Sequence, residues 1–188
     1  MSEICPSPTK CLQLMAEHQM LPNIQEHSLR VTEVALMVGK ALVKSGFPLH
    51  LPLLEAGALL HDIAKTICLQ NGGDHAQIGA EWLQDYGYPA VAEIIRKHVY
   101  LPARLLESPY ICEAEVVNYA DKRVMHTQVV PLKVRFADLR NRYGRNDQAR
   151  QRITALELRT RRLEHKLFTP LSLDPPDLLC INDSRRVV

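Results

Sequence analysis

Apolar residues recur with helical spacing along nearly the whole of this 188-residue chain, and this periodicity restricts the fold more than any other feature. Within residues 23–45, for example, the apolar side chains fall on one face of a helix, and Gly46 ends the pattern. No segment shows a convincing alternation of apolar and polar residues, which would mark a half-buried strand. The sequence therefore predicts an all-α protein built around one core.

Residues that favour helix ends divide the chain into segments. Ser7 and Asp74 suit the N-cap position, while Pro8 and Pro89 suit the first helical turn. The stretch 51–66 is the most uniformly apolar, so we expect it to form one central, buried helix. The expected helices cover residues 8–20, 23–45, 51–66, 74–86, 89–98, 112–125, 131–143 and 147–167.

We predict one helical domain with a short appendage at each end. Residues 1–22 would form an N-terminal helix that packs on the domain, and residues 23–144 would form the domain itself. Residues 145–188 would form a highly charged C-terminal helix and a Pro-containing tail. We expect residues 99–111 and the tail from residue 169 to be irregular, because both contain prolines.

Composition excludes several functional classes. The formal net charge is only +2 and aromatic residues make up 5%, which argues against a polycation that coats nucleic acid or stacks on its bases. The five cysteines are widely spaced without a CxxC pair, so we expect reduced thiols and a cytoplasmic location. No apolar run approaches the ~20 residues needed to cross a bilayer, and no signal-peptide pattern begins the sequence.

Charge is distributed unevenly along the chain. Residues 1–121 contain 8 Lys or Arg and 14 Asp or Glu, whereas residues 122–166 contain 13 and 4. The basic segment could attract phosphates, or it could be a solvated face paired with the acidic part of the chain. Nucleic acid is not the partner we expect, because aromatic residues are not interleaved with the basic ones.

The doublet His61-Asp62, within the apolar run ALLHDIAK, is the strongest local signal for chemistry. A carboxylate in such a run needs a partner, and an imidazole beside a carboxylate suits a divalent metal ion. Lys65 lies three residues after Asp62 on the same helix surface. It could bind a phosphate oxygen, or it could form a plain helix salt bridge with Asp62.

Four further polar side chains lie in or at the ends of apolar helices: His27, His75, His98 and Asp121. Taken singly, each histidine is typical of a core histidine with two hydrogen-bond partners, and Asp121 could pair with Lys122 or Arg123. Taken together, the set indicates a metal site, because helical bundles hold ions between inward-facing histidines and carboxylates.

The order His27, His61-Asp62 and Asp121 resembles the signature of the HD-domain superfamily of metal-dependent phosphohydrolases. The segments GALLHDIAK, DHAQIGAEWL, RKHVYLP and NYADKRV are similar to the motif segments of that superfamily. The resemblance covers about residues 23–143 and implies an HD-like helical bundle in the central domain.

The resemblance also implies a set of ligands for a divalent cofactor, which could be Mn, Fe, Co, Ni, Mg or Zn. Residues matching the first metal position are His27, His61, Asp62 and Asp121. His75 and His98 match the second metal position of two-metal members, in which the doublet Asp bridges both ions. Val99 follows His98 where several two-metal members carry another histidine, so the second position lacks one ligand. The resemblance therefore implies either one ion or two.

The activity implied by the resemblance is hydrolysis of a phosphoester or phosphoanhydride, with a nucleotide as the expected small-molecule substrate, by metal-activated water. Asp62 and Asp121 would orient or deprotonate the water, and Lys65 would offset charge on the phosphoryl group, with Arg123 or Arg135 as further candidates. The alternative is a metal-binding regulatory or interaction module without turnover. Its partner surface or homodimer contact would be the basic helix 147–167.

Overall fold

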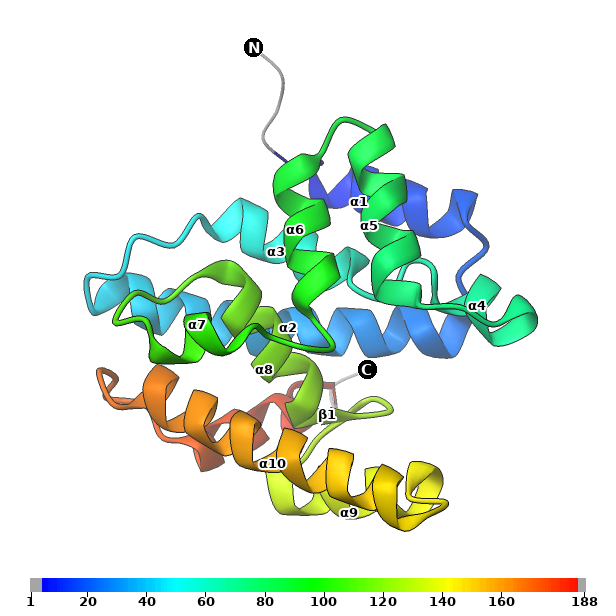
Figure 1. Cartoon of the computed structure of the whole chain (residues 1–188). Coiled ribbons are helices and arrows are strands. Elements are labelled where there is room, and N and C mark those ends of the chain that lie inside the picture. The colour runs from blue at the N-terminus through cyan, green and yellow to red at the C-terminus, as the bar shows by residue number, and fades with distance from the viewer. Residues whose placement is uncertain (1–4, 186–188) are drawn as a thin grey trace.

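The computed structural model describes residues 5–185, so the first four residues of the expected N-terminal segment and the last three of the expected C-terminal segment lie outside it. The described chain forms ten α-helices, one short β-hairpin and a 3₁₀ segment (Figure 1). The elements are α1 (Pro8–Glu17), α2 (Pro22–Lys44), α3 (Leu51–Leu60), α4 (Lys65–Asn71), α5 (His75–Asp85), α6 (Pro89–Lys97), α7 (Ala103–Glu107), α8 (Glu113–Arg123), β1 (Val124–Met125), β2 (Gln128–Val129), α9 (Leu132–Tyr143), α10 (Asp147–Phe168) and η1 (Pro175–Arg185).

The predicted all-α class is confirmed, and so are several predicted helix ends. The Ser7 hydroxyl accepts a hydrogen bond from the Lys10 amide at the start of α1. The Asp74 carboxylate accepts from the amides of Ala76 and Gln77 at the start of α5. These side chains satisfy backbone donors that have no partner within the first helical turn, which is why they fix the helix ends.

Two apolar cores lie on either side of α3. The first lies among α2, α8, α9 and α10, and the second among α1, α5 and α6. Leu54 and Ala58 of α3 join the first core, whereas Leu59 and Leu60 join the second. This helix is therefore the central, buried element that its composition predicted. Figure 1 shows the α5–α6 and α9–α10 pairs at opposite ends of the molecule, with α2 and α3 between them.

Helix α3 approaches α6 closely at Gly57. A Cβ atom on Gly57 would lie 2.8 Å from Cγ2 of Ile94, so only glycine allows this spacing without a shift of Ile94. The close approach brings together the C-terminal ends of the two helices, where the rings of His61 and His98 have centroids 5.1 Å apart. The packing of α3 on α6 thus begins to assemble the expected site.

The predicted single helix over residues 51–66 is wrong, because α3 ends at Leu60 and α4 begins at Lys65. Residues 61–64 form turns in which the Ile63 amide donates to the Leu60 carbonyl and the Lys65 amide to the Asp62 carbonyl. These bonds span three residues instead of the four of an α-helix, so the backbone is wound more tightly. The tighter turn allows the adjacent side chains His61 and Asp62 to reach one site.

The segments expected to be irregular contain local structure. Residues 99–111 include α7, which begins after Pro102, and the tail from residue 169 includes the 3₁₀ segment η1, which begins at Pro175. Proline fixes φ near the helical value and needs no hydrogen bond in a first turn, so it opened these segments instead of disrupting them. The hairpin β1–β2 was not predicted, because two-residue strands are too short to show alternation.

The C-terminal segment is fastened to the hairpin. The Asn182 side chain accepts from the Val129 amide at 2.8 Å and donates to the Val129 carbonyl at 2.9 Å. Arg30 of α2 is 2% exposed and donates to the carbonyls of Ile181 and Thr127. The side chain of Ile181 is itself part of the first core. Segment η1 therefore acts as a strap that holds the hairpin against α2.

Part of the basic segment is paired with acidic side chains. Glu157 accepts hydrogen bonds from Arg140 and Arg161, and Lys166 forms an ion pair of 2.6 Å with the buried Glu115. The apolar residues of α10 pack against the first core: Ile153, Leu156, Leu163 and Leu167. Among residues 5–185, no helix is long and apolar enough to span a membrane.

We predict that Asn182→Ala lowers the free energy of unfolding by about 1–3 kcal/mol, because two hydrogen bonds to the hairpin backbone are lost. Urea denaturation followed by circular dichroism measures this change. Asn141→Ala, at an exposed position of α9, is the matched control. Equal stability of the two variants would show that the strap is not held by Asn182.

Candidate metal centre

The six predicted ligands come from five parts of the chain that are distant in sequence. His27 lies in the second turn of α2, the His61-Asp62 doublet follows α3, His75 begins α5, His98 caps the end of α6, and Asp121 lies in α8. All six are brought together in one region. Several lie at helix ends, where polar side chains meet without interrupting the apolar cores.

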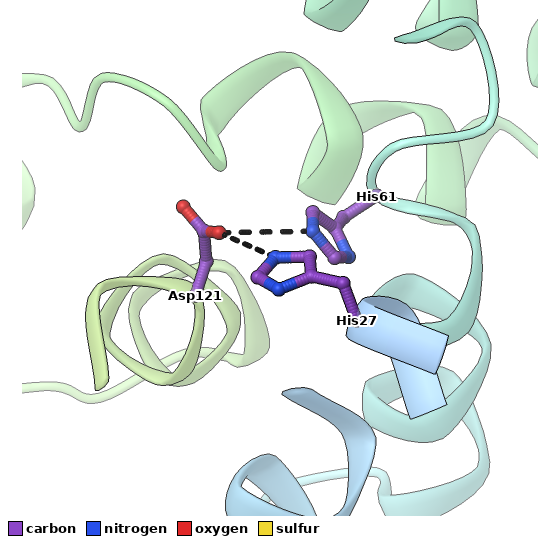
Figure 2. Close-up of side chains that lie close together, drawn as sticks. All are labelled: His27, His61 and Asp121. Carbon is purple, nitrogen blue, oxygen red and sulfur yellow. Dashed lines mark hydrogen bonds and ion pairs between the residues drawn. The ribbon is translucent and has the colours of Figure 1, made fainter. Parts of the chain in front are cut away.

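His27, His61 and Asp121 form one group, which Figure 2 shows with the two imidazoles facing the carboxylate. Oδ1 of Asp121 lies 3.1 Å from Nε2 of His27 and 3.8 Å from Nε2 of His61. The ligand atoms of the three residues all lie within 4.8 Å of one another, close enough to converge on a single ion.

Asp62, His75 and His98 form a second group of the same kind. Oδ1 of Asp62 lies 3.2 Å from Nε2 of His75 and 3.5 Å from Nε2 of His98. The other oxygen of this carboxylate, Oδ2, faces the first group, at 3.3 Å from Nε2 of His61 and 4.0 Å from Nε2 of His27. The Asp62 carboxylate thus lies between the two groups.

Three of the imidazoles are oriented by backbone carbonyls. Nδ1 of His27 lies 2.8 Å from the carbonyl oxygen of His126, Nδ1 of His61 lies 2.8 Å from that of Ala58, and Nδ1 of His98 lies 2.7 Å from that of Ile95. A carbonyl oxygen only accepts, so each Nδ1 carries a proton. In the neutral ring, Nε2 then presents its lone pair to the centre of the site.

Two buried atoms at the centre have no hydrogen-bond partner within the described part of the chain, namely Nε2 of His61 and Oδ1 of Asp62. Both are acceptors when the histidines are neutral, because Nε2 of His61 faces Oδ2 of Asp62, and Oδ1 of Asp62 faces Nε2 of His98. Facing acceptors repel unless a proton or a cation lies between them. The donor set of imidazole nitrogens and carboxylate oxygens suits a divalent transition metal. The residues present therefore fit a metal ion and could hold one.

The electrostatics of the site favour charged carboxylates. Burial alone would raise the pKa of Asp62 and Asp121, but neighbouring groups outweigh it and hold both pKa values well below the usual range. For Asp62 the chief neighbour is His61, and for Asp121 it is Lys122. Burial lowers the pKa of His98 to about 4, so this ring is neutral at physiological pH.

The two lysines near the site form ion pairs with its carboxylates. Lys65 lies 2.7 Å from Oδ2 of Asp62, so the helix salt bridge considered from the sequence is present beside the imidazole contacts. Lys122 lies 2.9 Å from Oδ2 of Asp121, which decides between the two partners considered for that carboxylate. The Lys65 side chain remains 37% exposed, so this residue lies at the boundary between the buried site and solvent.

Arg123, a candidate for contact with phosphate, is instead 2% exposed and has structural partners. Its guanidinium donates to the carbonyls of Val130 and Pro175 and to the hydroxyl of Tyr119. It also forms an ion pair of 3.3 Å with Glu164. These contacts tie α8 to α10 and to the strap, so the expectation that Arg123 assists at the phosphoryl group is not supported.

Some groups of the site were not identified from the sequence. The orienting carbonyls of Ala58, Ile95 and His126 belong to the backbone, so side-chain identity gives no signal for them. Lys122 was considered only as a partner of Asp121. Its place in the helical segment VVNYADKRV, beside Asp121, is a signal that could have marked it as a buried charge.

A model of the HD domain family matches residues 24–125, which are more than half of the chain. This chain belongs to the HD domain family. Membership places it in a superfamily of metal-dependent phosphohydrolases. No solved structure gives a significant match.

This chain spans most of one relative but less than half of two others that are named as enzymes. An uncharacterized protein of Methanocaldococcus jannaschii is 27% identical over 146 residues, or 71% of this chain and 85% of that protein. Ribonuclease Y of Aquifex aeolicus is 35% identical over 100 residues, or 52% of this chain and 17% of the ribonuclease. The tRNA (cytidine(56)-2'-O)-methyltransferase of Thermoplasma volcanium is 29% identical over 147 residues, or 68% of this chain and 41% of that enzyme.

We predict that Mn²⁺ or Co²⁺ raises the melting temperature of the metal-stripped HD protein by about 5–10 °C at a concentration near 100 times Kd, because the ion binds only the folded state. His61→Ala removes one of the unpartnered acceptors and should abolish the increase. His165→Ala, at an exposed position, should retain it. Differential scanning calorimetry measures the shift, and an unshifted wild type would contradict a metal centre here.

Proposed function

We propose that this HD protein is a metal-dependent phosphohydrolase that cleaves a phosphoester or phosphoanhydride. The observation that carries the proposal is the pair of buried, unpartnered acceptors at the centre of the ligand set, Nε2 of His61 and Oδ1 of Asp62. A core that only required packing would not bury an imidazole lone pair and a carboxylate oxygen without a cation or a proton to bind them. Residues 23–144 would form the catalytic domain, with the flanking segments packed on it.

The ligands divide naturally between two positions. The first position would be held by His27, His61, Asp62 and Asp121, and the second by Asp62, His75 and His98, so that Asp62 would serve both. A divalent ion would supply Lewis acidity and a water of lowered pKa. The mixed imidazole and carboxylate donors suit Mn, Fe, Co, Ni and Zn, with Mg less favoured by the imidazoles.

The side chains of the site have distinct roles in this proposal. The carboxylates of Asp62 and Asp121 stay ionised, so they can accept a hydrogen bond from the attacking water and orient it. Lys65 combines an accessible side chain with a position beside Asp62, and its ammonium group would bind a phosphoryl oxygen. Three imidazoles are locked by their carbonyl partners, so the ligand geometry is preorganised.

The substrate we propose is a nucleotide, such as a mono-, di- or dinucleoside polyphosphate, in the cytoplasm. A phosphodiester in RNA is a second candidate, since two relatives are named for enzymes of RNA. Exposed basic side chains at one end of the molecule also favour it, namely Lys133, Arg145, Arg152 and Arg162.

The competing proposal is a metal-stabilised regulatory module without turnover, for which the same basic end would be the partner surface or dimer contact.

We predict that Asp62→Asn reduces hydrolysis below detection and that Lys65→Met reduces kcat by about a hundredfold, because each removes a charge that acts on the reacting groups. The substrates are an aryl phosphate, the nucleotides above and an oligoribonucleotide, each with Mn²⁺ or Co²⁺. Asp85→Asn, at an exposed position of α5, is the matched control.

Elemental analysis of the purified protein separates the proposals. Metal bound in the wild type but absent from the His61→Ala/Asp62→Ala double variant is the expected result. Bound metal without turnover of any of these substrates would favour the regulatory module over the enzyme. Equal metal content in the wild type and the double variant would contradict the assignment of the site.

A further inference from the structure

We propose that Lys122 is a positioning residue that links the two ligand groups, by holding the Asp121 carboxylate and the backbone of His98 in one fixed arrangement. This inference rests on the proposed function, because it concerns how the ligands of the metal centre are kept in place. Lys122 lies in α8, next to Asp121 in the sequence, and its side chain is only 6% exposed.

The ammonium group of Lys122 has two partners, one from each ligand group. Nζ lies 2.9 Å from Oδ2 of Asp121 and donates a second hydrogen bond of 2.7 Å to the carbonyl oxygen of His98. A buried ammonium is costly unless it is paired and hydrogen-bonded, and these contacts provide both. The same atom therefore ties α8, which carries Asp121, to the end of α6, which carries His98.

The first consequence concerns the carboxylate. Because Lys122 occupies Oδ2 of Asp121, only Oδ1 is directed at the imidazoles, at 3.1 Å from Nε2 of His27 and 3.8 Å from Nε2 of His61. A carboxylate without this contact could turn about its terminal bond and offer both oxygens to one ion. Lys122 thus favours binding through a single oxygen.

The second consequence concerns His98. The final carbonyls of a helix have no hydrogen-bond partners within the helix. Here the side chains of Lys122 and Asn118 donate to these carbonyls. The side-chain amide of Asn118 donates through Nδ2 to the carbonyls of Lys97 at 3.1 Å and His98 at 2.8 Å. These bonds fix the backbone that carries the imidazole, while the bond between Nδ1 and the Ile95 carbonyl fixes the ring.

Asn118 provides the comparison that separates positioning from simple packing. Both side chains are buried, both lie in α8, and both donate to the His98 carbonyl. Only Lys122 also contacts Asp121. A role confined to completing the end of α6 would make the two residues equivalent, whereas a role in linking the ligand groups makes Lys122 the more important one for ion binding.

The test is Co²⁺ binding to the metal-stripped full chain. Isothermal titration calorimetry measures the affinity, and visible absorption reports the coordination of the bound ion. For Lys122→Met we expect about 10–100-fold weaker affinity, the usual effect of removing a group that orients a ligand. At saturating Co²⁺ we also expect an altered absorption spectrum, because Asp121 is free to bind through both oxygens. Asn118→Ala should change the affinity by less than about threefold and leave the spectrum unaltered, since Lys122 still holds both partners.

Lys40→Met, the same substitution at an exposed position of α2, is the control and should match the wild type. If the methionine variant does not fold, Lys122→Gln replaces it, because glutamine retains a donor but loses the charge and the reach. The same weaker affinity and altered spectrum are expected for it.

The outcomes distinguish this inference from the proposed function. A wild type that binds no Co²⁺ overturns the proposed function, and the inference with it. A wild type that binds Co²⁺ while the Lys122 variants keep its affinity and spectrum overturns the inference alone. Equal weakening in Asn118→Ala and Lys122→Met also overturns it, because completion of the α6 end would then account for the whole effect.

Discussion

The arrangement of this molecule depends on one buried carboxylate. The Asp62 side chain is 1% exposed, and removal of an ionised carboxylate from water costs several kcal/mol unless other groups compensate. Here part of the compensation comes from Lys65, and a cation bound among the imidazoles of His61, His75 and His98 would supply the rest. Each of these groups lies on a different helix or turn, so the charge of Asp62 constrains how the surrounding helices are placed.

The two apolar cores make this delivery possible. One core places α2 and α8 beside α3, and the other places α5 and α6 against its opposite side. The candidate ligands then lie where these helices begin or end, or on the helix surface between the cores. In this way the protein keeps polar groups together in one region while the rest of the interior stays apolar, as close packing requires.

Much of this organisation follows from local rules that a sequence displays. The apolar periodicity, the caps at Ser7 and Asp74, and the proline in the first turn of α6 predicted the helices. The polar residues in apolar runs were predicted as one set, and the structure brings their side chains together. The break between α3 and α4 was missed, because residues 61–64 have ordinary helical propensities and the break depends on tertiary contacts. Backbone carbonyls that orient imidazoles leave no trace in side-chain identity.

The hairpin limits where this chain can be joined to another member of the HD family in a chimera. The region shared with the HD family ends at residue 125, between the two strands, although the carbonyl that orients His27 belongs to His126. Segment η1 holds this hairpin through Asn182 and Arg30. A recombination joint placed at the family boundary would therefore separate His27 from the carbonyl that orients its ring. Any chimera of this chain must carry the hairpin and its strap together with the histidine that they serve.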